Sequence, residues 1–194
     1  MGLFLLLVFA YLIGAIPTGI ILTKLTGGED IRKVGSGNIG ATNVYRTAGR
    51  KMGLITLAGD SLKGLIPVLI AMLCGIHGAE LGMVGLLALI GHCYPVYIGF
   101  KGGKGVATAV GAFIVISPGS LLLVLSLFLV VLGRWRYISL ASISAAATIP
   151  YLVLVIEQSM MLFFVSFCMS ALVIYRHKDN IERLLTKKEN KFSL

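Results

Sequence analysis

Long stretches without a charged residue constrain this 194-residue chain more than any other feature. Asp, Glu, Lys and Arg are missing from residues 1–23, 64–79, 81–100 and 105–133, and Glu157 is the one exception in 137–175. Charged residues make up 13% of the chain, whereas a soluble domain averages about 25%. So short a chain cannot bury that much apolar surface from water, and its exterior must face lipid.

A helix that crosses the hydrocarbon core needs about 20 apolar residues, with a usual range of about 17–25. The apolar stretches therefore predict five full spans, and these lie near residues 3–23, 53–74, 81–99, 138–156 and 158–175. The first stretch has no basic segment before it and is longer than the apolar part of a signal peptide, so we interpret it as a membrane helix.

The stretch 105–133 is too long for one span, and Ser117-Pro118-Gly119 interrupts it. Proline and glycine rarely sit inside an intact helix, so two short helices are expected, about 105–116 and 119–133. The predicted fold is an all-α, polytopic transmembrane helix bundle with about seven spans, in one domain covering residues 1–194. A re-entrant pair at 105–133, which leaves five full spans, is the alternative.

Lysines and arginines follow the first, third, fifth and seventh predicted helices, whereas the opposite loops contain His77, Glu80 and Glu157 and no basic residue. The positive-inside rule then places the C-terminus in the cytoplasm and the N-terminus outside. The net charge of +9 suits anionic lipid headgroups, and nucleic acid is a poor partner for so apolar a chain. Lys63 is the exception: it lies inside the second helix, three residues after Asp60, and we expect the two to neutralise each other.

Cysteines and histidines do not predict a metal site. The three cysteines lie in apolar runs without a C-x-x-C pair, which is typical of small buried apolar residues. The three histidines are too scattered to have the spacing of metal ligands. We therefore expect no metal and no cofactor. His92 and Pro95 are expected to shape a helix end.

The first polar motif is GSGNIGATNVYR, residues 35–46. Its G-x-G-x-x-G pattern indicates a dinucleotide site only inside a βαβ unit, and here membrane helices flank it, so we reject that function. Glycines let backbone N–H groups approach an anion. Asn38 is expected to cap a short helix over 39–48, on which Asn43 and Arg46 share a face. A surface turn with a solvated arginine is equally compatible with the pattern.

The second motif is GFKGGKG, residues 99–105. It is not a phosphate-binding Walker A loop, because Gly105 stands where Ser or Thr must bind magnesium. A glycine-rich turn with lysines at a helix N-terminus nevertheless suits a phosphate group. An ordinary basic loop is the alternative, and four glycines in seven residues favour a functional loop.

The third motif is RHKDNIER, residues 176–183, where the last predicted span ends. On a continuous helix, His177, Asn180 and Leu184 share one face, and His177 is able to act as a base near neutral pH. A solvated helix end with alternating charges is the alternative. Ser139 and Ser142 lie three residues apart at the start of a predicted helix, where packing between helices is the commoner role of serine.

Together these segments resemble a known family. GSGNIGATNVYR, GHCYPVYIGFKGGKGVATA and RHKDNIERLL are similar, in this order and at suitable spacing, to the three signature motifs of the bacterial acyl-phosphate:glycerol-3-phosphate acyltransferases. YLIGAIPTG resembles the first helix of that family, so the similarity covers nearly the whole chain. One departure is that the family often has a glycine after the RLL segment, whereas residues 185–189 contain none.

The resemblance implies transfer of an acyl chain from acyl phosphate to the 1-hydroxyl of glycerol 3-phosphate, giving lysophosphatidate and inorganic phosphate at the cytoplasmic face of the bacterial inner membrane. It implies membrane lipids and these substrates as partners, with no obligate protein partner and no cofactor. The catalytic positions that it implies are Ser36, Arg46, Lys104, His177 and Asn180. The substrate- or phosphate-binding positions expected with them are Gly35, Gly37, Asn38, Gly40, Thr42, Asn43, Lys101, Gly102, Gly103 and Ser142.

The chemistry leaves the base open. Phosphate is a competent leaving group, so positioning and charge neutralisation are sufficient for catalysis, and either His177 or a substrate phosphate takes the hydroxyl proton. No activating partner for Ser36 is evident, which argues against a covalent acyl-enzyme. A transporter of an organic phosphate and a non-catalytic regulator of lipid synthesis are the alternative functions; the first lacks an inverted repeat, and the second leaves the polar motifs without a use.

Overall fold

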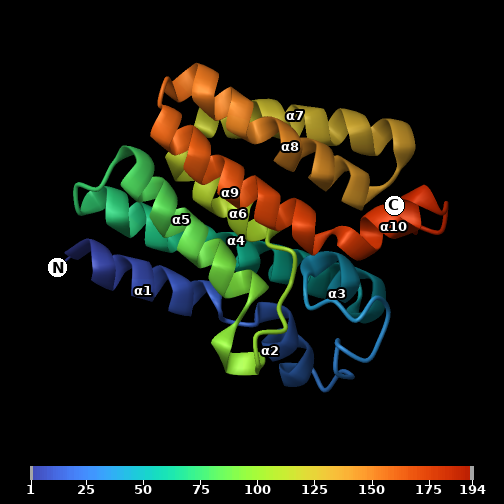
Figure 1. The fold of residues 1–194 in the computed structure, drawn as a ribbon. Helices are drawn as coiled ribbons and strands as arrows, with labels where there is room; N and C mark the ends of the chain where they lie inside the picture. Colours follow the sequence, from blue (N-terminus) through green and yellow to red (C-terminus); the bar gives the residue numbers. More distant parts are fainter. Residues whose placement is uncertain (1, 193–194) are drawn as a thin grey trace. The chain divides into compact units, whose positions relative to one another are not determined.

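The computed structural model describes residues 2–192, and these residues form helices and loops without a strand. Figure 1 shows the helices, coloured from the N-terminus to the C-terminus. They are α1 (Gly2–Gly14), α2 (Thr18–Leu25), α3 (Ala41–Ala48), α4 (Arg50–Leu73), α5 (Gly78–Cys93), the 3-10 helix η1 (Val96–Ile98), α6 (Val106–Ile116), α7 (Pro118–Trp135), α8 (Ile138–Glu157), α9 (Met160–Arg176) and α10 (Lys178–Leu185). The predicted all-α class is confirmed. The chain divides into two compact units: unit 1 ends at Ile116 and unit 2 begins at Ser117.

Four helical segments are long and apolar enough to cross a membrane: α4, α5 with η1, α7 and α8. The number rises to six if the bent pairs α1 with α2 and α9 with α10 each count as one span. The predicted interruption is confirmed, because α6 ends at Ile116 and α7 begins at Pro118, where a missing N–H costs nothing at the first helical position. Helix α7 is not short, as its 18 residues suffice for a span. The count of about seven spans stays a prediction.

The first predicted helix is not continuous. The prediction of one helix over 3–23 is wrong, because α1 ends at Gly14, α2 begins at Thr18, and the two axes differ by 40°. Pro17 explains the break: proline supplies no N–H, and it disfavours helical backbone at the residue before it, Ile16.

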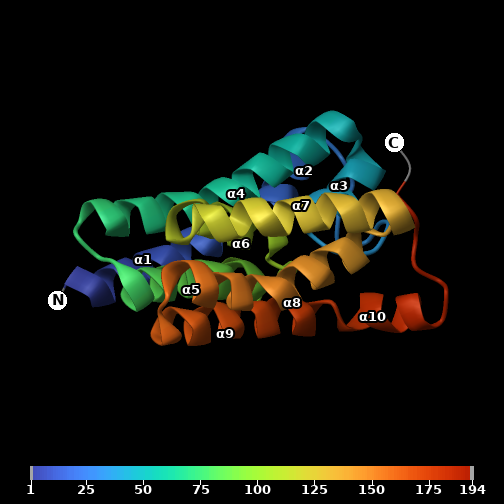
Figure 2. The same cartoon turned by 90° about the horizontal axis from the view of Figure 1, so that it is seen from above.

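Glycines let the helices of unit 1 approach closely. A Cβ atom on Gly64 would lie 2.0 Å from the carbonyl oxygen of Thr108, and one on Gly111 would lie 1.8 Å from that of Ser61. Helices α4 and α6 therefore touch backbone to backbone, and Figure 2 shows them side by side. Likewise, a Cβ atom on Gly14 of α1 would lie 2.1 Å from the carbonyl oxygen of Ala88 on α5. Small residues at such contacts are typical of helices packed in membranes.

Unit 2 joins its helices through hydroxyl groups. Helix α8 packs between α7 and α9. At one end of this layer the Ser117 hydroxyl donates to the Glu157 carboxylate at 2.7 Å and lies 2.8 Å from the Ser120 hydroxyl. The Ser170 hydroxyl on α9 donates to the carbonyl of Ala146 on α8.

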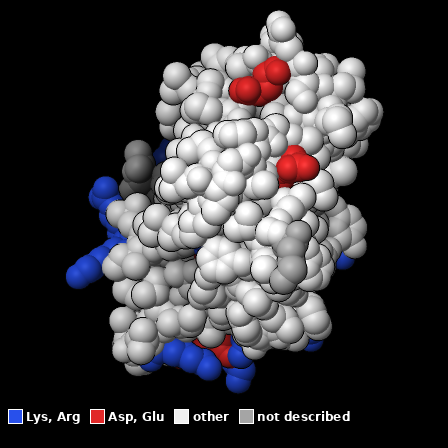
Figure 3. Space-filling view, turned by 90° about the vertical axis from the view of Figure 1, so that its left-hand side faces the viewer, with Lys and Arg blue, Asp and Glu red and all other residues white. Residues whose placement is uncertain are grey.

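The charged residues inside α4 form the expected pair. Lys63 Nζ lies 2.8 Å from Asp60 Oδ1, and both side chains are buried. The exterior, by contrast, carries many large apolar side chains, among them Phe4, Leu25 and Leu122. Figure 3 shows one face on which neutral residues dominate, with small acidic patches and with Lys and Arg at its margins. A surface of this kind suits lipid and not water.

Candidate functional site

The first loop, residues 35–40, is shaped by glycines and by one buried amide. Gly35 and Gly37 have φ angles of 60° and 69°, a region that glycine enters without a steric penalty. A Cβ on Gly35 would lie 2.3 Å from Asn43 Oδ1, so a side chain there is excluded by space as well. The loop therefore wraps directly around the Asn43 side chain.

Asn43 holds this loop from the first turn of α3. Its Oδ1 accepts from the Ser36 N–H at 2.8 Å, and its Nδ2 lies within 3.1 Å of the carbonyl oxygens of Ile31, Val34 and Asn38. The residue is 3% exposed. The Asn43 amide is therefore used inside the loop, and its expected contact with a ligand beside Arg46 stays a prediction.

Asn38 is also placed differently from the prediction. Its side chain accepts from the Gly40 N–H at 2.9 Å and does not cap the helix. Helix α3 begins at Ala41 with Gly40 in extended conformation before it, two residues later than expected. Thr42, in the first turn, is half-buried.

The exposed groups of this region are Ser36 and Arg46. They lie on the loop and on the last turn of α3, respectively. Both side chains are exposed, and the Ser36 N–H is engaged by Asn43. That Arg46 is the cation of the first motif in a site stays a prediction.

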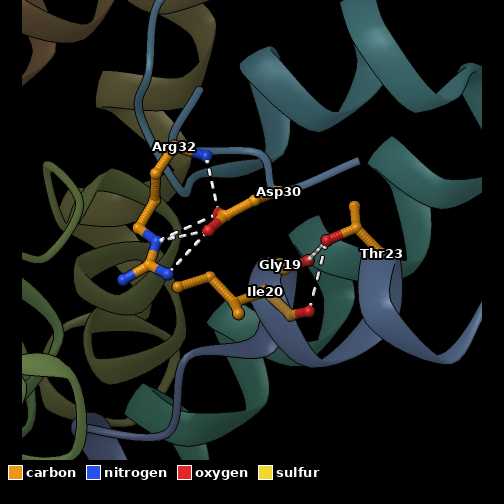
Figure 4. Close-up of polar contacts among 5 residues, drawn as sticks. All are labelled: Gly19, Ile20, Thr23, Asp30 and Arg32. Carbon is orange, nitrogen blue, oxygen red and sulfur yellow. Dashed lines mark hydrogen bonds and ion pairs between the residues drawn. The ribbon is translucent and has the colours of Figure 1, made fainter. Parts of the chain in front are cut away.

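Arg32, in the segment before the loop, has a different role. Its guanidinium binds Asp30 with contacts of 2.6–3.2 Å, and its N–H adds a bond of 3.1 Å (Figure 4). The side-chain hydrogen bond to Arg32 holds the pKa of the Asp30 carboxyl well below its usual range. Arg32 and Asp30 therefore form a local turn, and Figure 4 also shows Thr23 bonded to the carbonyls of its own helix α2.

The KGGKG loop, residues 101–105, lies against the end of α5. The Gly102 N–H donates to the Cys93 carbonyl at 3.2 Å, and the Gly103 N–H donates to the His92 carbonyl at 3.1 Å. Both N–H groups are therefore bonded to backbone carbonyls, and the expected role of these two glycines in phosphate binding stays a prediction. Their lack of a side chain serves close packing, because a Cβ on either residue would lie 2.1 Å from an atom of His92.

The two lysines of this loop differ in exposure. Lys101 is exposed and Lys104 is half-buried, two residues before α6 begins at Val106. A cation at this place lies next to the helix N-terminus, whose partial positive charge adds to its own in attracting an anion. That Lys104 is the cation of the second motif in a site stays a prediction.

One apolar cluster of unit 1 joins the first motif to the segment just before the second motif. The cluster consists of Ile20, Ile31, Ile39 and Val44. Ile98 of η1, just before the KGGKG loop, packs against it. The first and second motifs, about 60 residues apart in the sequence, are therefore neighbours, as the motif spacing alone did not require.

The third motif lies in unit 2 and bends at His177. Helix α9 ends at Arg176, α10 begins at Lys178, and their axes differ by 58°. The helix therefore does not continue straight through the motif, so the face that a continuous helix would give to these residues does not apply. His177 Nδ1 lies 2.7 Å from the Val173 carbonyl oxygen, which has no proton to give, so Nδ1 carries the hydrogen. A neutral imidazole then presents Nε2 as its basic nitrogen.

Three side chains converge on Glu189, a residue outside the predicted set. The Ser139 hydroxyl and Asn180 Nδ2 donate to Oε1 at 2.8 and 2.7 Å, and Arg183 Nε donates to Oε2 at 2.6 Å. Burial alone raises the pKa of the Glu189 carboxyl, but the hydrogen bonds from Asn180, Ser139 and Arg183 outweigh it and leave the pKa below its usual value. Glu189 is thus an anion that fixes the Asn180 amide.

A helix-ending turn brings Glu189 back to α10. The Lys188 N–H donates to the Arg183 carbonyl and the Lys187 N–H to the Leu184 carbonyl, which is the pattern of a Schellman motif. Lys187 occupies its left-handed position with a φ of 57°. Glycine is the usual residue there, so this lysine adopts a conformation that glycine enters more easily.

Ser142, the remaining predicted residue, is buried on α8, and its hydroxyl donates to the Ile138 carbonyl at 2.9 Å. It is Ser139, one turn earlier, that reaches Glu189. Among residues 2–192, no group of three or more His, Cys, Asp or Glu side chains is placed to hold a metal ion. The structure thus assembles the first and second motifs in unit 1, and the third motif with Ser139 and Glu189 in unit 2.

Comparisons with known proteins give one family for this chain. Residues 4–187 match the family described as glycerol-3-phosphate acyltransferase. A protein of that name from Syntrophotalea carbinolica is 55% identical, over 97% of each chain. The crystal structure of PlsY, an integral membrane glycerol 3-phosphate acyltransferase in its glycerol 3-phosphate form, aligns with a TM-score of 0.94 and 44% identity, covering 100% of this chain and 96% of the other. Its lysophosphatidic acid form gives 0.92 and 43%, with the same coverage.

Proposed function

This chain belongs to the glycerol-3-phosphate acyltransferase family, and on that premise we propose that it takes its acyl group from an acyl phosphate at the cytoplasmic face of the bacterial inner membrane. The acceptor is glycerol 3-phosphate, and the products are lysophosphatidate and inorganic phosphate. Both substrates are phosphorylated, and one carries a long alkyl chain. A site for them needs cations close to the edge of a lipid-facing helix bundle.

One observation carries this proposal: Ile39 and Val44 of the first motif belong to an apolar cluster against which Ile98, just before the second motif, packs. We infer that this packing brings the Arg46 guanidinium and the Lys104 ammonium to one site, as a pair of phosphorylated substrates requires. Charge-assisted bonds from Arg and Lys to phosphate are about twice as strong as neutral hydrogen bonds. We assign phosphate binding to Arg46 and Lys104, with Lys101 at the exposed edge and Ser36 orienting a substrate.

The glycines and amides of the motifs act behind these cations. Gly35, Gly37 and Asn43 give the first loop its path, and Gly102 and Gly103 let the second loop contact α5. We assign them no direct phosphate contact. Asn38, Gly40 and Thr42 complete the turn into α3.

In unit 2, His177 and Asn180 are proposed to orient the reacting groups. The 1-hydroxyl oxygen of glycerol 3-phosphate attacks the acyl carbonyl carbon, and the bond from this carbon to the phosphate oxygen breaks. The hydroxyl proton goes to His177 Nε2 or to a phosphate oxygen. Since phosphate leaves without further protonation, electrostatic stabilisation and positioning supply the rate enhancement. Ser142, bonded within α8, acts through packing beside Ser139.

The cytoplasmic orientation rests on charge. Basic residues follow the predicted helices on one side only, and short basic loops remain in the cytoplasm. Glycerol 3-phosphate is itself a charged, water-soluble acceptor, so the cations that bind it must be reachable from an aqueous compartment. An activity tag fused to the C-terminus that worked outside the cell and not inside it would contradict this orientation.

The direct test uses the purified protein with synthetic acyl phosphate and radiolabelled glycerol 3-phosphate. We expect labelled lysophosphatidate and one inorganic phosphate per turnover, with no added protein, nucleotide or metal. The comparison donors are two thioesters, acyl coenzyme A and acylated acyl carrier protein. Equal turnover with a thioester in place of acyl phosphate would reject the proposed donor, and uptake of label into vesicles without lysophosphatidate would indicate a transporter.

The cations are tested one at a time. Arg46→Ala and Lys104→Ala each remove one charge-assisted contact, which is worth about 1.5–3 kcal/mol, or about 10- to 100-fold in kcat/KM. Lys51→Ala, at an exposed position in the first turn of α4, is the matched control and should retain activity. Wild-type values in both variants would remove these residues from the site.

The base is tested with His177→Asn. The new amide can still donate to the Val173 carbonyl, so the local bond is retained while Nε2 is lost. A fall of about 10²–10⁴-fold in kcat is expected if histidine is the general base. Turnover close to that of the wild type would assign the proton to the substrate phosphate.

A further inference from the structure

Three ionisable side chains that the proposed reaction does not use are buried together in unit 1. Asp60 and Lys63 lie on α4 and His92 lies on α5, and they are 2%, 5% and 3% exposed. Lys63 Nζ lies 2.8 Å from Asp60 Oδ1. Ionisable groups inside a membrane-spanning helix are costly, and they usually serve a function beyond packing.

Lys63 reaches a second partner, and this partner lies in the break of the first span. Its Nζ donates to the Ile16 carbonyl at 2.8 Å. Ile16 precedes Pro17, where α1 has ended and α2 has not begun, so its carbonyl lacks a regular helical donor. The Lys63 ammonium therefore ties α4 to the break between α1 and α2.

His92 connects the same ion pair to the KGGKG loop. On one side, His92 Nδ1 lies 3.9 Å from Asp60 Oδ1. On the other side, the ring touches Gly103, since a Cβ built there would lie 2.1 Å from His92 Nε2. The His92 carbonyl also accepts from the Gly103 N–H at 3.1 Å. The imidazole thus lies between the Asp60 carboxylate and the backbone that precedes Lys104.

From this arrangement we propose that Asp60, Lys63 and His92 are positioning residues, which fix the KGGKG loop and through it the Lys104 ammonium for binding of the glycerol 3-phosphate phosphate group. The inference rests on the proposed function of Lys104. It assigns a task to an ion pair that charge neutralisation alone would also explain. The two roles differ in what they predict when both charges are removed together.

If the two residues only neutralise each other, a double variant that removes both charges should recover both its stability and its affinity for glycerol 3-phosphate. Asp60→Asn or Lys63→Met by itself leaves one uncompensated charge inside the membrane, which damages folding whatever the pair does. Asp60→Asn combined with Lys63→Met removes both charges and restores the electrical balance. If the pair also positions the loop, the double variant regains its thermal stability but not its affinity for the acceptor.

The experiment measures Tm, kcat and the two KM values for wild type, both single variants and the double variant. We expect the double variant to melt close to the wild type, to keep its KM for acyl phosphate, and to raise its KM for glycerol 3-phosphate about tenfold, the effect of one weakened bond to a charged group. Wild-type KM values for both substrates in the stable double variant would overturn the proposal.

Two variants of His92 keep the test decisive if the double variant does not fold, because both leave the ion pair intact. His92→Leu removes the group between Asp60 and Gly103, whereas His92→Asn keeps an N–H near the Nδ1 position. We expect a raised KM for glycerol 3-phosphate in the leucine variant and partial rescue in the asparagine variant. Equal KM values for the two variants would overturn the proposal.

A binding readout separates this inference from the proposed donor. The rise in Tm that glycerol 3-phosphate produces is measured in detergent without any acyl donor, and we expect a smaller rise in His92→Leu than in the wild type. A wild-type protein that fails to use acyl phosphate but shows this difference would reject the donor and leave the positioning role standing. Equal rises in the two proteins would reject the positioning role.

Discussion

The two units fix their polar motifs by opposite means. In unit 1, glycines bring backbone against backbone or against one buried side chain, and the hydrogen bonds of the loops end mostly on carbonyl groups. In unit 2, three side chains converge on the single carboxylate of Glu189. Added volume should therefore damage the loops of unit 1 most, whereas loss of one negative charge should damage the third motif of unit 2 most.

The largest effect is expected from Gly103→Ala in unit 1. The new Cβ would lie 2.1 Å from His92 Nε2, so the loop or the imidazole must move, and a shift of about 1 Å at a substrate-positioning group costs about 100-fold in rate. The measurement is kcat/KM for glycerol 3-phosphate in purified protein. Gly133→Ala, where a Cβ meets no atom within 4 Å, is the control and should be active.

Asn43→Ala should be the next most harmful change. It removes the group that binds the Ser36 N–H and the carbonyls of Ile31, Val34 and Asn38, and each buried group left without a partner costs about 1–3 kcal/mol. We expect a lower Tm and a strongly reduced activity. Thr47→Ala removes only the bond to the Asn43 carbonyl, and its Tm should stay close to the wild type.

Glu189→Gln tests unit 2 by removing charge without changing shape. The pair with Arg183 and the bond from Asn180 lose their ionic character, and charge-assisted bonds are worth about 1.5–3 kcal/mol. Tm and kcat are both expected to fall, the latter because Asn180 is no longer fixed. Glu182→Gln, at an exposed position on α10, should change neither Tm nor kcat. Equal losses in both variants would show a general effect of charge near α10.

Acid should affect unit 2 through the same carboxylate. The Glu189 pKa is lowered in the folded state, so its contribution to the free energy of unfolding is complete above the unfolded value, near 4.5, and is lost as the pH falls through the folded pKa. Melting curves between pH 7 and pH 3 should therefore show a smaller acid-induced drop for Glu189→Gln than for the wild type. Parallel curves would contradict the assignment.

The smallest expected effect is a gain. Lys187 has a φ of 57°, and a residue other than glycine in this region carries a strain of about 1 kcal/mol. Lys187→Gly should therefore raise Tm slightly and leave activity unchanged, as measured by thermal melting beside a turnover assay. A lower Tm would mean that the lysine side chain contributes contacts that exceed the strain.

The features that sequence predicted were local ones. The Asp60–Lys63 pair followed from a spacing of three residues on one helix, and the end of α6 followed from Pro118, whose ring fixes its own backbone. The segmentation into helices was likewise read from runs of apolar residues, which the membrane requires whatever the tertiary packing.

The missed features depend on distant contacts. Ser139 and Glu189 are 50 residues apart, and nothing in either segment marks the other. The hydrogen bonds of Asn43 inside the loop were not predicted, because helical spacing gives the face of a residue and not what covers it. The missing glycine near Lys187 obscured the helix-ending turn, although the sequence after RLL still forms it. A signal for the break at Ile16 was present, since Pro17 interrupts the first apolar run.

The ion pair of α4 also bears on how the chain enters the bilayer. Because Asp60 and Lys63 are one turn apart on a single helix, the segment carries its own counterion and can leave the translocation machinery as a neutral dipole. The Ile16 carbonyl that completes the shell of Lys63 belongs to a segment synthesised 47 residues earlier. The break between α1 and α2 therefore already presents this carbonyl when α4 enters the membrane. This favours assembly of unit 1 in the order of its synthesis.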